Sequence, residues 1–295
     1  MRKYEVIFFD WDGTAVLSRK APADPAAQAM APLLAVGVKL VIVSGTSFKN
    51  IDGGNLANRF EPEHRANLYF GLDRGANNYG FDKSGNTISI PGVIADCEKT
   101  QALHEACFDF HMKLLKEYGL NTDIVFCRDN YCKIDIGSDI SRGDNLFFSG
   151  GELEQVSMNL ALHGYTEGVR GLITLAESLG RERNLSLKAT TDAKYIELGF
   201  GTKSDNVDAI LTYLEPGFGG VPDCCFWGDE YLEMDDGIYG SDSYMITEKT
   251  KTFEFFDVSD ADGKRPAQVL QLGGGVERFL SFLREQSSVH ICSGG

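Results

Sequence analysis

The sequence lacks any long uninterrupted apolar run. A helix that crosses a bilayer needs roughly 18 to 20 apolar residues, and no segment of the 295 residues comes close to that length. An N-terminal apolar run follows a basic pair, as in a signal peptide, but Asp10 and Asp12 interrupt it, so we predict no export signal. Internal repeats and low-complexity segments are also missing. These absences favour a globular protein of the cytoplasm.

The sequence has no Cys-x-x-Cys pair, and its seven cysteines are scattered and odd in number. This pattern favours reduced, mostly buried thiols over a disulfide framework. Cys127 and Cys132 flank a predicted hairpin turn, where we expect cross-strand packing rather than metal binding. The spacing of His104, His111 and His163 does not indicate a ligand set either.

Positive charge is scarce. Lys and Arg number 28 against 43 Asp and Glu, for a net charge of −15. Such a chain repels phosphate backbones and anionic lipid surfaces, so we expect neither a nucleic acid nor a membrane as partner. A small anionic substrate would need local positive groups or a metal. The hydrophobic fraction of 43% argues against disorder, and the length suits two domains or one large α/β domain.

Apolar runs and helical periodicity predict an α/β core at both ends of the chain. Runs at 4–9 and 39–43 are typical of strands buried on both faces, with a helix from Pro25 to Val36 between them. A strand, a helix and a strand in this order imply a parallel sheet. The pattern resumes with a helix after Lys203, strands at about 224–227, 243–247 and 253–258, and a helix at about 276–285.

The middle of the chain has a different character. Residues 71–85 are rich in Gly, Asn, Asp and Ser, which is typical of turns and hinges. After them we expect a long helix at about 96–118, a hairpin at 124–127 and 131–136, helices at 152–163 and 168–180, and strands at 185–190 and 194–198. The predicted fold is therefore a Rossmann-like, doubly wound parallel sheet formed by residues 1–82 and 196–295, with an inserted α+β domain at 83–195.

Asp10 and Asp12 stand at the carboxyl end of the first predicted strand, where open parallel sheets bind ligands. Two carboxylates one residue apart repel each other, and one pKa is expected to rise. A cleft tolerates them when a divalent cation is present or when one of them holds a proton. The pair therefore indicates a catalytic or cation-binding site rather than an ordinary surface turn.

The segment Phe8-Phe-Asp10-Trp-Asp12-Gly13-Thr14 resembles the first motif of the haloacid dehalogenase (HAD) superfamily, in its phosphatase form. In that family the first aspartate attacks phosphorus and the second protonates the leaving oxygen. The resemblance implies that Asp10 is the nucleophile, Asp12 the general acid and base, and an aspartyl-phosphate the intermediate. A carboxylate nucleophile and a neighbouring acid agree with that chemistry.

Two later segments resemble the family's phosphate-binding motifs. Val41-Ile-Val-Ser44-Gly45 is similar to the second motif, an apolar strand ending in a hydroxyl. Gly201-Thr-Lys203 is similar to the third, whose lysine neutralises charge on the nucleophile and the phosphoryl group. The resemblance thus implies phosphate binding by Ser44, Gly45 and Lys203.

Phe226-Trp-Gly228-Asp229 resembles the fourth motif, which implies a Mg²⁺ site made of Asp10, the backbone carbonyl of Asp12 and Asp229. Oxygen ligands of this kind suit Mg²⁺. The acidic loop that follows is longer than the usual pattern. Gly240-Ser-Asp242 is similar to the corresponding segment of longer-looped members, so Asp242 is the preferred second acid. The alternatives are Glu230, Glu233, Asp235 and Asp236.

The insert resembles the type C2 cap of the Cof-like branch, with Arg74 in place of that branch's usual Asn before Gly-Ala. Such a cap is expected to close over the substrate. Its basic residues are candidates for contacting a polar substrate tail: Arg128, Lys133, Arg142 and Lys188.

These resemblances together imply Mg²⁺-dependent hydrolysis of a small phosphate monoester, such as a sugar phosphate. Two alternatives stay open at this point. A phosphomutase would use the same phospho-aspartate, and a non-catalytic protein would only bind a phosphorylated metabolite. The sequence specifies neither the substrate nor the oligomeric state.

Overall fold

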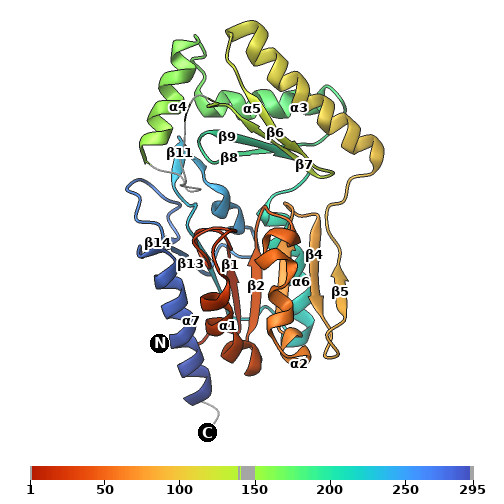
Figure 1. The fold of residues 1–295 in the computed structure, drawn as a ribbon, viewed down its shortest axis with the longest axis vertical. Helices are drawn as coiled ribbons and strands as arrows, with labels where there is room; N and C mark the ends of the chain where they lie inside the picture. Colours follow the sequence, from red (N-terminus) through yellow and green to blue (C-terminus); the bar gives the residue numbers. More distant parts are fainter. Residues whose placement is uncertain (1, 139, 141–149, 293–295) are drawn as a thin grey trace.

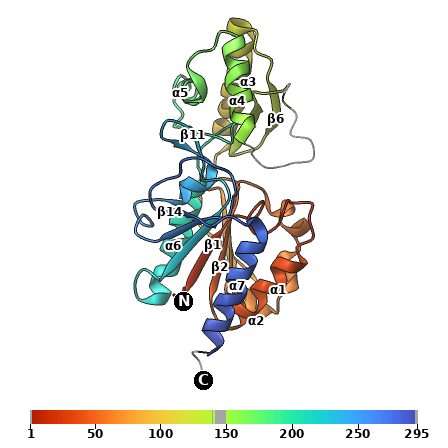
Figure 2. The same ribbon diagram turned by 90° about the vertical axis from the view of Figure 1, so that its left-hand side faces the viewer.

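The two larger β-sheets of this computed structural model lie in a core and in a cap over it (Figure 1). The structure describes residues 2–138, 140 and 150–292. The core contains the beginning and the end of the chain, and the cap is formed by its middle (Figures 1 and 2). The predicted α/β core with an inserted α+β cap is confirmed.

The core sheet has eight strands in the order β14-β13-β10-β1-β2-β3-β4-β5. The six strands from β14 to β3 run parallel, whereas β4 and β5 are antiparallel additions at one edge. The sheet is therefore mixed rather than purely parallel. The bounds are β1 (Val6–Phe9), β2 (Lys39–Val43), β3 (Leu68–Leu72), β4 (Asn77–Phe81), β5 (Thr87–Ile90), β10 (Cys224–Gly228), β13 (Glu254–Asp257) and β14 (Val269–Gln271).

Helices cover both faces of this sheet (Figure 2). Every residue of β1 is buried, because its side chains alternate between the two faces. Ile7 and Phe9 pack in one apolar cluster with α1 (Asp24–Ala35) and α7 (Gly275–Cys292), while Val6 and Phe8 pack against α6 (Lys203–Phe218). Short helical segments complete the first face: η1 (Phe48–Asn50), η2 (Asp52–Gly54), η3 (Leu56–Arg59) and α2 (Pro62–Arg65).

The segment 71–85, predicted as turns and hinges, forms turns at 73–76 and 83–85, but it also contributes the end of β3 and all of β4. Its two strand glycines, Gly71 and Gly80, serve close packing. A Cβ on Gly80 would lie 2.7 Å from the Tyr69 ring, and Tyr79 stacks on Phe70 with ring centroids 4.9 Å apart. Composition alone does not separate this use of glycine from a turn.

The cap is a four-stranded antiparallel sheet, β6-β7-β9-β8, with three helices on its outer face (Figure 1). Both predicted hairpin partners and all three helices are present. The bounds are α3 (Cys97–Tyr118), β6 (Asp123–Cys127), β7 (Tyr131–Asp135), α4 (Gly150–Leu162), α5 (Gly168–Arg181), β8 (Lys188–Thr191) and β9 (Tyr195–Gly199).

Both boundaries between core and cap lie a few residues later in the chain than the expected positions 82/83 and 195/196. β5 still belongs to the core sheet, and β9 to the cap sheet. We therefore propose that the cap spans about residues 91–200.

The loop after β10 also differs from expectation. Instead of a strand at 243–247 it forms the short helix η4 (Ser241–Met245), preceded by the hairpin β11 (Glu233–Asp235) and β12 (Ile238–Tyr239). Buried Asp242 accepts hydrogen bonds from the backbone of Asp229 and Glu230, which folds the loop back onto the end of β10. Among the described residues, no helix is both long and apolar enough to span a membrane.

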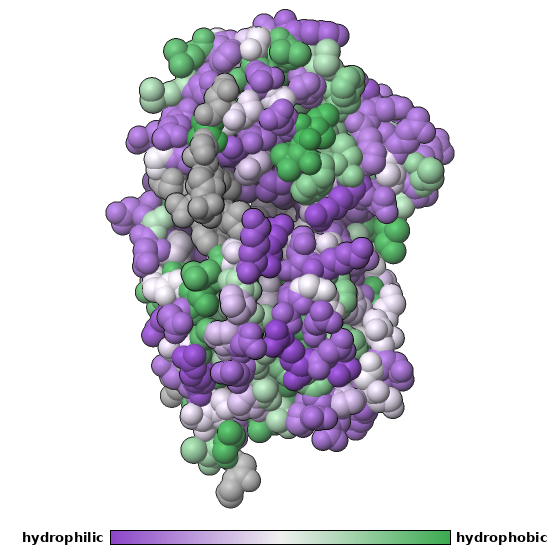
Figure 3. Space-filling view, viewed as in Figure 1, coloured by the Kyte–Doolittle hydropathy of each residue, from purple (hydrophilic) through white to green (hydrophobic). Residues whose placement is uncertain are grey.

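Polar contacts join the cap to the core. The Tyr131 hydroxyl donates to the Gly45 carbonyl at 2.5 Å, and Arg128 lies 3.2 Å from Asp73. Hydrophilic side chains also line much of this boundary on the face shown in Figure 3. A polar interface of this kind suits two bodies that can move relative to each other.

Candidate active site

Four of the predicted site residues lie at one edge of the core sheet. Asp10, Ser44 and Asp229 follow directly after the neighbouring strands β1, β2 and β10. Lys203 is the first residue of α6, whose start is fixed by a reciprocal capping arrangement between Thr202 and Asp205. Because parallel strands end at the same edge, segments up to 219 positions apart converge here.

Lys203 joins two buried aspartates. Its Nζ lies 3.0 Å from Asp10 Oδ1 and 2.7 Å from Asp242 Oδ1. The three residues are only 6%, 5% and 0% exposed, respectively. Burial by itself lowers the pKa of Lys203, but the two aspartates and Glu230 raise it well above its usual range. The lysine therefore carries a firm positive charge at the centre of the site.

The carboxylates around Lys203 carry more negative charge than one lysine balances. Oxygens of Asp10, Asp229 and Asp242 lie within 4.8 Å of one another. Burial raises the pKa of Asp10; Lys203 opposes that rise, and Asp242 and Glu230 add to it. Burial and then Glu230 raise the pKa of Asp229 well above its usual range. An all-oxygen, electron-rich set of this kind fits a hard divalent cation.

Two glycines leave room for this acidic cluster. Gly13 has φ +85°, and a Cβ there would lie 2.2 Å from Asp229 Oδ2. A Cβ on Gly228 would lie 2.3 Å from Asp242 Oδ2. Thr14 Oγ1 donates to Asp229 Oδ1 at 3.0 Å. The Gly-Thr pair after Asp12 thus positions the carboxylate of another segment.

Asp12 lies at the solvent side of the cluster. Its Oδ2 is 3.1 Å from the Arg19 guanidinium, and its Oδ1 is buried with no hydrogen-bond partner in the described part of the chain. Burial raises the pKa of Asp12, although Arg19 and Lys203 oppose the rise. A carboxyl with a raised pKa retains a proton more readily, as a general acid must.

Solved structures share this architecture. An N-terminally truncated IMP-nucleotidase from Plasmodium falciparum aligns with a TM-score of 0.58 and 13% identity, over 96% of this chain and 70% of its own. The sucrose-phosphatase from Synechocystis, solved with sucrose and phosphate, aligns with a TM-score of 0.51 and 11% identity, over 96% of this chain and 98% of its own. The chain has the haloacid dehalogenase fold. No family sequence model matches the chain, and a search of curated proteins finds no match.

A pocket of about 660 Å³ opens between the HAD core and the cap. Ser44 and Gly45 line it together with Asp10, Asp12 and Lys203. Several other polar residues of the same wall were not predicted from the sequence. They are Arg19, Lys20, Thr46 and Ser241 from the core, and Thr190, Thr191, Asp192, Lys194, Tyr195 and Glu197 from the cap. One sequence feature could have indicated part of this wall. The basic pair Arg19-Lys20 follows closely after the two aspartates in an otherwise acidic chain.

Only some of the basic cap residues predicted to contact the substrate line the pocket. Arg128 and Lys133 line the pocket, whereas Lys188 lies 2.8 Å from Asp205. Arg142 lies outside the described residues. Lys133 is 3.3 Å from Asp192 and 3.2 Å from Glu197, so its charge is largely balanced.

The alternative acids of the loop after β10 also lie in different places. Glu230 lines the pocket. Glu233 is 3.4 Å from Lys264, and Asp235 accepts from the backbone of Arg170. Both belong to the β11–β12 hairpin of the HAD core.

Proposed function

We propose that this protein hydrolyses the phosphate monoester of a small metabolite through an aspartyl-phosphate intermediate. The observation that carries the proposal is the buried cluster in which Lys203 contacts Asp10 and Asp242 beside Asp229. The structurally similar proteins described as IMP-nucleotidase and sucrose-phosphatase support it, since both names refer to phosphate esters.

Asp10 acts as the nucleophile in this mechanism. One of its carboxylate oxygens bonds to phosphorus while the bond from phosphorus to the ester oxygen breaks. Asp12 gives its proton to the departing oxygen. It then accepts a proton from the water that attacks phosphorus, which releases inorganic phosphate and restores Asp10. Arg19, at 3.1 Å from Asp12, stabilises the carboxylate form that exists between the two steps.

Lys203, the Ser44 hydroxyl and the Gly45 backbone bind the phosphoryl oxygens. Phosphoryl transfer depends mainly on positioning and on charge stabilisation. Lys203 is fixed for this task by Asp242, whose second oxygen accepts from the backbone of Asp229 and Glu230 at 2.9 and 2.8 Å. Asp242 thus orders both the lysine and the segment that carries Asp229.

Asp10, Asp229 and the Asp12 carbonyl would hold Mg²⁺, with Asp242 completing the acidic surroundings. Burial, and then the neighbouring carboxylates, raise the pKa of Asp10 and Asp229. This fits such a site, because a bound cation would stabilise both carboxylates in their charged form. When bound, the ion would neutralise charge on the transferring phosphoryl group.

The cap wall favours a hydroxyl-rich leaving group such as a sugar. Lys133, Asp192 and Glu197 offer closely spaced donors and acceptors, with two negative charges against one positive charge. Such a wall suits neutral hydroxyl groups better than a second phosphate.

The test is hydrolysis of p-nitrophenyl phosphate, followed by phosphate release from a panel of phosphorylated metabolites. We expect turnover that a chelator removes and added Mg²⁺ restores. Transfer of the phosphoryl group to a second hydroxyl would identify a phosphomutase. Tight binding of phosphorylated metabolites without turnover on any of them would identify a non-catalytic binding protein and contradict the proposal.

Replacing Gly13 by alanine tests the architecture of the cation site. At φ +85° a Cβ costs about 1–2 kcal/mol of stability, and here it also displaces Asp229. We expect the Mg²⁺ concentration for half-maximal activity to rise roughly 10- to 100-fold, the scale on which disturbed ligand surroundings act. Gly37→Ala is the matched control, because Gly37 has φ +90° and open space at its Cβ. Equal Mg²⁺ dependence of the two variants would contradict the assignment.

A further inference from the structure

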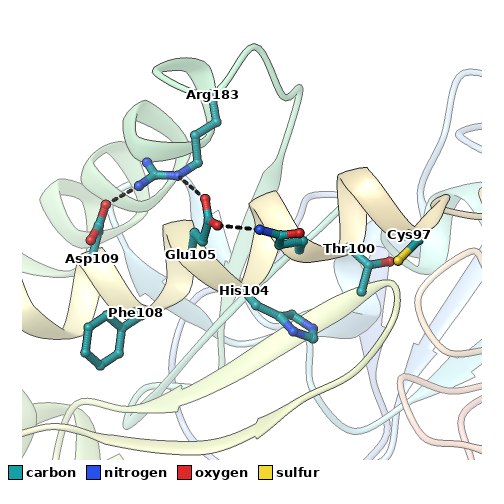
Figure 4. A pocket seen from close by; sticks show the side chains of 8 residues that line it. Cys97, Thr100, His104, Glu105, Phe108, Asp109 and Arg183 are labelled. Carbon is teal, nitrogen blue, oxygen red and sulfur yellow. Dashed lines mark hydrogen bonds and ion pairs between the residues drawn. The ribbon is translucent and has the colours of Figure 1, made fainter.

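Two thiols and an imidazole meet in the cap, and a third thiol is buried in the same cap core, in a part of the chain separate from the acidic cluster. Cys127 at the end of β6 pairs with Cys132 of β7 across the hairpin. His104 and Cys107 project from the neighbouring helix α3, three positions apart and therefore on one helix face. Figure 4 shows His104 extending toward the hairpin, whereas Glu105 and Asp109 point toward Arg183.

The ligand atoms of these residues are close together. A ring nitrogen of His104 and the sulfurs of Cys127 and Cys132 all lie within 4.8 Å of one another. Cys107 is buried in the same apolar cluster of the cap as Cys132. In a tetrahedral zinc site with Zn–S bonds near 2.3 Å, neighbouring ligand atoms are about 3.8 Å apart. Small side-chain adjustments would therefore bring His104, Cys127 and Cys132 to that geometry, and Cys107, one helical turn after His104, is the fourth ligand available.

The surroundings also fit a metal. His104 Nε2 lies 2.9 Å from the Arg128 carbonyl, a contact of the kind that orients metal-binding histidines. Cys107 and Cys132 are fully buried, whereas Cys127 is exposed. The site is thus protected on its inner side and open to an ion arriving from solvent.

We propose that His104, Cys107, Cys127 and Cys132 form a structural zinc site. Thiolate and imidazole ligands select zinc over the hard cations that suit the acidic cluster. On binding, each thiol loses its proton to solvent as its sulfur bonds to the ion, so no oxidant or reductant is required.

Zinc there would fasten α3 to the hairpin that reaches the core. The turn between β6 and β7 already accepts a hydrogen bond from Thr100 Oγ1 at the Asp129 carbonyl. On its other side, Tyr131 donates to the carbonyl of Gly45. The site would thus stabilise the cap segment that contacts the pocket wall.

The proposal is tested by titrating the reduced, metal-free protein with Zn²⁺ against a chromophoric chelator, and with Co²⁺ by absorption. We expect one Zn²⁺ bound per chain, a higher melting temperature, and thiolate-to-cobalt charge-transfer bands that a carboxylate site cannot produce. Cys127→Ser, at an exposed position, and His104→Ala should lower the Zn²⁺ affinity by more than the roughly 10- to 100-fold that loss of an outer-shell contact costs.

Cys292→Ser is the control, because Cys292 is an exposed thiol in the last turn of α7. Asp10→Asn should leave the cobalt bands intact, which separates this site from the acidic cluster. Wild-type affinity in Cys127→Ser would overturn the proposal. So would a Cys127–Cys132 disulfide in the isolated protein combined with no charge-transfer band after reduction.

Discussion

Asp10→Asn is expected to abolish phosphatase activity, with kcat falling by about 10⁴-fold or more, the scale on which loss of a covalent nucleophile acts. The amide keeps the shape of the side chain but is a far weaker nucleophile. Lys203 keeps its contact with Asp242 at 2.7 Å, so the fold and the melting temperature should stay close to those of the wild type. Steady-state release of inorganic phosphate and a thermal melt measure the two effects.

Asp262→Asn is the matched control, because it makes the same chemical change at an exposed loop position. It should leave both measurements unchanged. If the enzyme is denatured during turnover of a substrate with a labelled phosphate, we expect labelled phosphate to stay bound to the wild-type chain. None should stay bound to Asp10→Asn. Substantial turnover by that variant, with unchanged metal dependence, would show that Asp10 is not the nucleophile.

The sequence predicted the elements whose local pattern matches their final environment. β1, β2 and β10 are apolar without interruption because they are buried on both faces. Each is followed by a polar side chain, and the parallel arrangement then brings Asp10, Ser44 and Asp229 to one edge. The helix that begins at Lys203 was equally predictable. Capping residues mark its start, and an apolar stripe with helical spacing follows them.

Other features depend on contacts that no local pattern contains. β4 contains two asparagines and a glycine, and the glycine is needed because Tyr69 packs against Gly80. Such a segment looks like a turn when its partner strand is unknown. The loop carrying Asp242 folds back through a side chain that binds distant backbone groups. His104 meets Cys127 and Cys132 only after α3 packs on the hairpin, so spacing along the chain did not indicate a ligand set.

Asp12→Ala is expected to slow the hydrolysis of alkyl phosphates by roughly 10²- to 10⁴-fold, the usual contribution of a general acid and base. An alkoxide leaves poorly without a proton, whereas nitrophenolate leaves readily without one. With p-nitrophenyl phosphate the first step should therefore be much less affected than the second, in which Asp12 accepts the proton of water. Rapid mixing should show a burst of about one nitrophenolate per chain, followed by slow turnover.

The burst separates the proposed role from a purely structural one. If Asp12 only anchored Arg19, at 3.1 Å from its carboxylate, Arg19→Ala would reproduce the phenotype of Asp12→Ala. If Asp12 transfers protons, Arg19→Ala should retain most of the alkyl phosphatase activity and give no burst. Equal losses on alkyl and aryl substrates in Asp12→Ala, without phosphorylated enzyme accumulating, would contradict proton transfer at this residue. The raised pKa that burial confers on Asp12 favours proton transfer, since the protonated form is the one needed when the ester bond breaks.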